Sequence, residues 1–117
     1  GRALPKDPDP RWYGYSVGRW EDDYTLVVQT VGTDDRTWLD NAGNFHGDKL
    51  HVVERYTRTG PDTMRYEATI ADPEVFERAW NIRVDLARHA EPNFQILEHE
   101  CERDAKGVYR HPPQFLK

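Results

Sequence analysis

The sequence predicts a mainly β fold: an antiparallel meander of about six strands that forms a barrel or half-barrel, with one short helix and irregular termini. Apolar and polar residues alternate in most of the expected strands, and short turns rich in Gly, Pro and Asp separate them. Parallel strands would need crossover helices of about ten residues or more, and one short helical stretch is visible. At 117 residues the chain has room for one domain, with four Trp, six Tyr and four Phe to fill its core.

The first expected hairpin joins residues 12–21 to residues 24–31 across Asp22 and Asp23. Its second strand is rich in β-branched residues, which favour strands. Trp20 stands at the end of the first strand, and we expect it in the core.

The second expected hairpin follows a long loop over residues 32–49 and joins 50–57 to 64–70 across a Gly-Pro-Asp turn. In the first strand one face carries Leu50, Val52, Glu54 and Tyr56 and the other carries His51, Val53, Arg55 and Thr57. In the second strand the apolar residues fall on every second position, at Met64, Tyr66, Ala68 and Ile70. This alternation is typical of a strand with one face in a core and the other in water.

One short helix and two more strands complete the predicted domain. Asp72 is a good N-cap and is followed by Pro73, so a helix is expected from there to about Ala79. Trp80 then opens an alternating strand and is expected in the core, and a sixth strand is expected over 94–101.

We divide the chain into three parts by composition. An extended, proline-containing arm covers residues 1–11, a single β domain covers 12–102, and an irregular C-terminal tail covers 103–117.

Charge and composition exclude several classes of function. The net charge is −5 and the Lys and Arg residues are scattered among acids, so we expect no nucleic-acid partner. No apolar run approaches the roughly 20 residues that cross a bilayer, so we expect no membrane-spanning segment. Cys101 is the single cysteine, which rules out an internal disulfide and every zinc motif built on several thiolates.

Two histidines lie near the second hairpin. His46 belongs to the loop and could fold over His51, with Asp48 as a third ligand, to form a mixed metal site. Loop histidines are more often solvated or bonded to backbone, and on a strand Glu54 points away from His51. We therefore expect neither a metal nor a cofactor.

A second polar group follows Phe94, with Glu98 and Glu100 on one strand face and His99 and Cys101 on the other. The two glutamates could face a polar barrel interior, where Arg55 or Arg65 would pair with them. A solvated edge strand accounts for the same residues and is the interpretation we favour.

Aromatic residues outside the expected core are candidates for binding. Trp12, Tyr13 and Tyr15 adjoin the proline-containing arm, and we expect them to form a packing or docking surface. Trp38 lies in the long loop, where it either plugs one end of the barrel or contacts a partner.

A series of short motifs carries a family resemblance. These motifs are Gly18-Arg19-Trp20-Glu21, Leu26-Val27-Val28, Thr37-Trp38-Leu39-Asp40, His46 and Leu50-His51-Val52-Val53-Glu54-Arg55. Together they resemble the C-terminal half of an uncharacterised family of exported bacterial proteins, many from soil and acidobacterial lineages. The resemblance implies a β-rich fold and a periplasmic or extracellular location, and the Gly-x-Trp pair is similar to that of lipocalin-like barrels.

Two hypotheses of function follow. In the first, the chain is a non-enzymatic extracytoplasmic domain that binds another protein or serves as an accessory subunit of a larger assembly. In the second, it is a small-molecule-binding or hydrolytic barrel with a pocket lined by His and Glu. The candidate ligand-binding or partner-binding residues are Trp12, Tyr13, Tyr15, Trp38, His46, His51, Glu54, Arg55 and Glu98.

Overall fold

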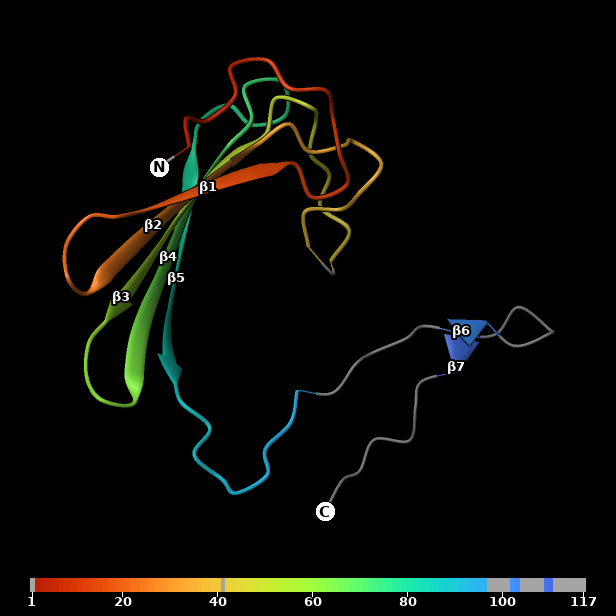
Figure 1. Ribbon diagram of the computed structural model, residues 1–117. Helices are drawn as coiled ribbons and strands as arrows, with labels where there is room; N and C mark the ends of the chain where they lie inside the picture. Colours follow the sequence, from red (N-terminus) through yellow and green to blue (C-terminus); the bar gives the residue numbers. More distant parts are fainter. Residues whose placement is uncertain (1, 41, 97–101, 104–108, 111–117) are drawn as a thin grey trace.

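A computed structural model describes residues 2–40, 42–96, 102–103 and 109–110. Among these residues, five strands form one antiparallel sheet in which each strand pairs with the next along the chain (Figure 1). The five strands are β1 (Tyr15–Trp20), β2 (Thr25–Val31), β3 (His51–Arg58), β4 (Thr63–Ala71) and β5 (Trp80–Ala87). The prediction of a mainly β, antiparallel meander is therefore confirmed.

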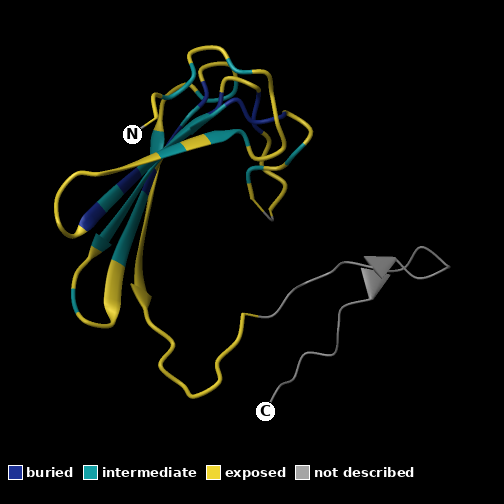
Figure 2. Cartoon of the chain, viewed as in Figure 1, coloured by how far each residue is buried: buried dark blue, intermediate teal, exposed yellow. Residues whose placement is uncertain are grey.

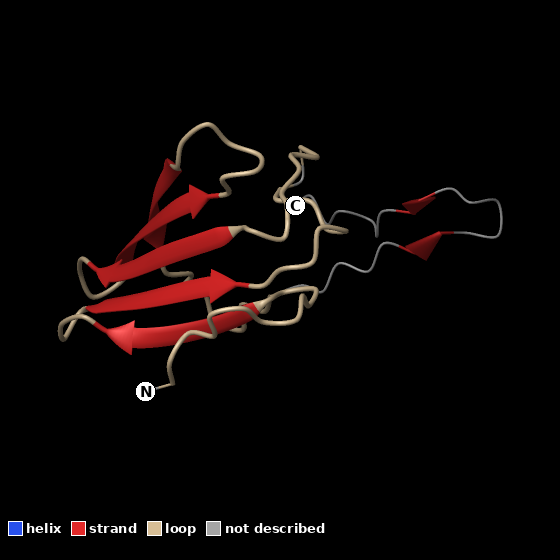
Figure 3. Ribbon diagram, turned by 90° about the horizontal axis from the view of Figure 1, so that it is seen from above, coloured by secondary structure: helices blue, strands red, loops and turns tan. Residues whose placement is uncertain are grey.

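The sheet is open, so the expectation of a barrel is wrong. Among the described strands β1 pairs with β2 alone and β5 with β4 alone, and the two edge strands do not meet. Figure 3 shows the five strands side by side in a single twisted layer. Closing a sheet requires hydrogen bonds between its first and last strands, and barrels whose interior is filled by side chains typically have about eight strands.

The sixth strand of the prediction does not begin where it was expected. Residues 94–96 are irregular, and the rest of that segment, 97–101, lies outside the described residues. Two short strands, β6 (Glu102–Arg103) and β7 (Tyr109–Arg110), pair with each other. β7 stands in the tail that we expected to be irregular, because a two-residue strand has no periodicity that a sequence pattern can reveal.

The helix expected from Asp72 to about Ala79 is also wrong, since the described residues contain no helix. The amide groups of Val75 and Phe76 both donate to the Asp72 carbonyl, at 3.2 and 2.8 Å, and this single turn then leads into β5. The Asp72 side chain accepts a hydrogen bond from the Glu74 amide at 3.1 Å, as an N-cap does, and another from the Gly47 amide at 2.6 Å. Asp72 therefore caps this turn as its position in the sequence indicated, but its carboxylate also binds the turn to the long loop through the Gly47 amide.

No described helix is long and apolar enough to cross a membrane.

Strand register divides the sheet into two chemically different faces. One, which we call the apolar face, carries Ser16, Gly18, Trp20, Leu26, Val28, Thr30, Val52, Glu54, Tyr56, Arg58, Met64, Tyr66, Ala68, Ile70, Trp80, Ile82, Val84 and Leu86. The other, which we call the charged face, carries Arg19, Arg55, Arg65, Glu67, Arg83 and Asp85 together with smaller polar and aliphatic residues. Successive residues of a strand point to opposite faces, so this division follows from the alternation in the sequence.

The acids of the charged face pair with its arginines. Arg65 Nε lies 3.1 Å from Asp85 Oδ1, and Arg83 Nε lies 3.9 Å from Glu67 Oε1. Arg55 pairs with Glu21 of the β1–β2 turn. Ion pairs at half-exposed positions contribute about 0–1 kcal/mol each, so their main effect is to keep this face compatible with water.

The buried residues gather in the loops at one end of the sheet and in β2 and β4 (Figure 2). Val27 of β2 is 1% exposed, and Asp72 is buried among the loops. The two tryptophans that we expected in the core are less buried. Trp20 is 68% exposed, so that expectation is wrong, because no described strand packs across the sheet to cover it. Trp80 is half-buried and meets Phe76 edge to face, with ring centroids 5.8 Å apart.

The Asp72 carboxylate yields the first prediction. Asp72→Ala should lower the free energy of unfolding by about 1–3 kcal/mol, because the buried Gly47 amide then loses its acceptor. Urea unfolding measures this loss. The matched control is Glu77→Ala at an exposed position of the same connection, where a change within about 0.5 kcal/mol is expected. Equal stability of the two variants would contradict the role given to Asp72.

Candidate functional site

The two histidines do not form a site together. His46 is 2% exposed, and both of its ring nitrogens are engaged: Nδ1 donates to the Gly47 carbonyl at 3.0 Å, and Nε2 lies 2.8 Å from Thr37 Oγ1. His51 is half-buried at the start of β3, and Asp48 is exposed beside Lys49. Within the described residues no group of three or more His, Cys, Asp or Glu side chains could hold a metal ion. His46 is thus a structural residue of the loop.

The aromatic residues near the arm are held by arginines. The Arg36 guanidinium lies over the Trp12 ring and that of Arg11 over the Tyr15 ring, each 4.6 Å from the ring centroid. Tyr13 is exposed. A cavity of about 440 Å³ lies here, lined by residues 10–14, Asp34 and Arg36. Trp12 and Tyr13 therefore line one cavity, and Tyr15 lies on the charged face of β1.

Trp38 does not plug an end of the sheet. It is 72% exposed, and it forms an isolated antiparallel bridge with Phe45 within the loop. Of the two alternatives for Trp38, the exposed contact is the one compatible with this position.

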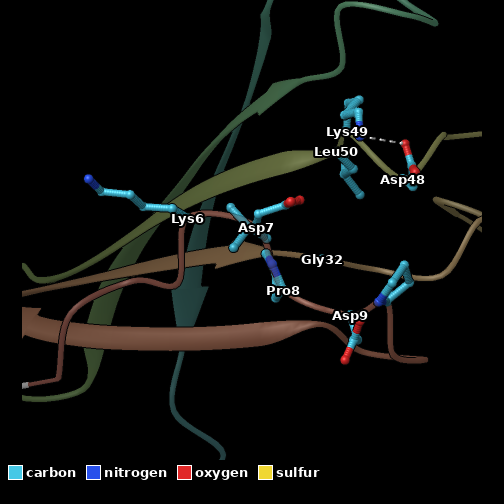
Figure 4. A pocket seen from close by; sticks show the side chains of 10 residues that line it. Lys6, Asp7, Pro8, Asp9, Gly32, Asp48, Lys49 and Leu50 are labelled. Atoms are coloured by element: carbon cyan, nitrogen blue, oxygen red, sulfur yellow. Dashed lines mark ion pairs between the residues drawn. The ribbon is translucent and has the colours of Figure 1, made fainter.

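The arm packs against the end of β2 and encloses a second cavity. Figure 4 shows this cavity, of about 340 Å³, between residues 6–10 of the arm and residues 48–50. Pro8 lies so close to Gly32 that a Cβ there would be 2.5 Å from Pro8 Cγ, and the φ of +68° at Gly32 also favours glycine. The lining charges are of both signs and include the Asp48–Lys49 pair at 3.5 Å, so no single charge dominates the cavity.

The apolar face of the sheet is the next candidate for a binding surface. Its outer part is open to solvent: Val84 and Leu86 of β5 are each 44% exposed, and Met64 and Ile82 are also exposed. No described strand packs across it, because β6 and β7 contact only each other. A sheet face of this composition is normally covered by a second layer of structure.

A pocket lies at the end of the apolar face, between the tips of the two hairpins. Its volume is about 420 Å³. The first hairpin contributes Trp20, Asp23, Tyr24 and Leu26, and the second contributes Tyr56, Arg58 and Met64. Apolar and aromatic side chains dominate this lining, as in most binding pockets.

Beside this pocket a carboxylate is held by two tyrosines. Tyr56 and Tyr66 are cross-strand partners, and their ring centroids lie 5.1 Å apart. Both hydroxyl groups donate to Glu54 Oε1, at 2.8 and 2.9 Å. Burial, and then the hydrogen bond to Glu54, raise the pKa of Tyr56 to about 12, and the same causes raise the pKa of Tyr66. Both phenols therefore stay protonated donors to Glu54 at neutral pH.

The structure brings few of the predicted site residues together. Glu54 lies on the apolar face and Arg55 on the charged face, while Trp12 and Tyr13 line a separate cavity. Glu98 lies outside the described residues. The two tyrosines beside Glu54 were missed, although their signal was present: each occupies an apolar position of an alternating strand and carries a hydroxyl group that needs a partner.

No protein-family model matches the chain, and no curated protein or solved structure matches it.

The tyrosine pair predicts a dependence of stability on pH. The ordinary tyrosine pKa is about 10, and the folded chain raises it at Tyr56 and Tyr66, so the folded state holds these protons more tightly. Their contribution to stability is full below about pH 10 and is lost as the pH rises through about 12. An absorbance titration of tyrosinate should show a late step that Tyr66→Phe reduces.

Tyr13→Phe is the control for that titration, because Tyr13 is exposed and far from Glu54 in the sequence. It should leave the late step unchanged. Ionisation of all six tyrosines in a single step near pH 10 would contradict the Tyr56–Glu54–Tyr66 arrangement.

Proposed function

We propose that this chain is a non-enzymatic protein-binding module, or an accessory subunit of a larger assembly, and that it docks through its apolar face. The observation that carries the proposal is the contrast between the two faces of the sheet. One is covered with paired charges, and the other exposes Trp20, Met64, Val84 and Leu86. Contiguous apolar surface that a folded chain leaves in water is typical of a protein interface.

The residue types on this face support the same proposal. Trp20 and Tyr24 stand exposed beside the pocket, and large aromatic side chains give much contact area for few rotatable bonds. The paired arginines of the opposite face would keep the complex soluble on its outer side. The proposal includes a periplasmic or extracellular location in a bacterium, and its support is the family resemblance of the sequence motifs.

Binding of a small molecule is the second candidate, and the pocket of about 420 Å³ favours it. The described residues give less support to a hydrolytic function. His46 has both ring nitrogens engaged, and His51 and Glu54 point to opposite faces of β3. A protein partner accounts for the whole face, whereas a small ligand accounts for one end of it.

Site-specific photo-crosslinking tests the proposed function. A photoreactive phenylalanine analogue replaces Val84, on the apolar face, or its chain neighbour Arg83, on the charged face, in cells that make the protein. We expect a discrete adduct with another protein from position 84 and none from position 83. No adduct at 84, or equal adducts at both positions, would contradict docking through the apolar face.

A further inference from the structure

Glu54 differs from the other acids of the sheet in having no positive partner among the described residues. On the charged face Glu67 and Asp85 each lie within 4 Å of an arginine nitrogen. Glu54 has two tyrosine hydroxyls and no cation, and Arg58, at the pocket beside it, donates instead to the carbonyls of Gly60 and Pro61.

The two carboxylate oxygens of Glu54 differ in their hydrogen bonding. Oε1 accepts both tyrosine hydroxyls, which uses its two lone pairs. Oε2 accepts no hydrogen bond from the described residues, and it is not among their buried atoms that lack a partner. Glu54 therefore offers one free oxygen, with a fixed orientation, on a face that a partner would cover.

A partner that covers the apolar face has to compensate the negative charge of Glu54. A carboxylate that is removed from water without a positive charge is costly, and the phenols supply hydrogen bonds but no charge. A guanidinium fork prefers both oxygens of a carboxylate, and here one oxygen is already saturated. An ammonium needs a single acceptor, and the adjacent tyrosine rings can stabilise it further.

We propose that the apolar face recognises a lysine side chain of a protein partner, with the ammonium on Glu54 Oε2 and apolar side chains beside that lysine packed on β4 and β5. This inference rests on the proposed function and adds the chemistry of the partner to it. The net charge of −5 is complementary to such a basic segment.

A second copy of this chain fits the face less well. β3 is the central strand of the sheet, and Glu54 lies near the middle of β3. Two sheets packed face to face about a two-fold axis would bring their Glu54 carboxylates toward each other, and Arg58, at the end of β3 on the same face, donates to the carbonyls of its own turn.

Titration of the purified chain with short peptides tests the proposal. The probe is the capped peptide Gly-Leu-Lys-Leu-Gly, compared with peptides in which norleucine or arginine replaces the lysine, and binding is followed by NMR shifts of apolar-face residues. We expect the lysine peptide to bind about five-fold more tightly than the norleucine peptide and more tightly than the arginine peptide. Added salt should reduce the difference between lysine and norleucine.

Two variants locate the effect. Glu54→Gln keeps an acceptor for the tyrosines and removes the charge, so it should abolish the preference for lysine over norleucine. Glu67→Gln removes a carboxylate from the charged face and should preserve that preference. Because the peptide comparison is made on the unaltered chain, the test does not depend on the folding of either variant.

The outcomes separate the two proposals. Equal binding of the lysine and norleucine peptides at the apolar face would overturn the role of Glu54 and leave docking through the face intact. Tighter binding of the arginine peptide would overturn the single-acceptor argument. Shifts outside the apolar face, or none at all, would contradict both proposals. Dimerisation of the free chain through this face would show that a second copy is the occupant and would overturn the lysine proposal.

Discussion

The pairing register between β3 and β4 is the constraint on which both faces of the sheet depend. It sets Tyr56 opposite Tyr66 and Glu54 opposite Ala68. Because side chains alternate along a strand, a shift of one residue would move every apolar side chain of β4 to the charged face. The same register places two phenols within reach of one carboxylate, so the chemistry of Glu54 is a direct consequence of strand pairing.

Buried hydrogen bonds hold the loops at one end of the sheet, whereas the surface proposed for partner binding is a face of the sheet. At the loop end, Asp72 accepts the Gly47 amide and His46 is bonded on both sides of its ring. The Asp72–Gly47 bond joins residues 25 apart in the sequence, and Phe76 of the same turn packs on Trp80. The outer part of the apolar face, at Val84 and Leu86, therefore stays open in the free chain while the sheet keeps its shape.

The sequence was informative about the strands and less so about what they do together. Alternation located β3, β4 and β5 and placed Glu54 on the same face as Tyr56, because those signals are local. It could not show whether β1 meets β5, since closure of a sheet depends on twist and on pairing between distant segments. For this reason the barrel was predicted in error.

The same limit applies to individual residues. Trp20 was expected in the core because a tryptophan in a strand usually is. Its burial would need a second layer of structure over the sheet, and the alternation of residues along a strand carries no information about such a layer. The helix after Asp72 was expected from a correct cap, yet the same carboxylate bonds the Gly47 amide, a contact at a sequence separation of 25 that no local pattern contains. The tyrosine–glutamate cluster was within reach of the alternation and was overlooked.

The central claim is that the isolated chain leaves the outer part of its apolar face, at Val84 and Leu86, open to solvent. NMR with a neutral, soluble paramagnetic probe measures this directly on side-chain methyl groups. The account predicts strong relaxation enhancement for the methyls of Val84 and Leu86, and protection of Val27 and Ile70, which are buried. Methyl groups of Val84 and Leu86 as protected as those of Val27 would show that the chain covers the outer part of its own apolar face and would contradict the account.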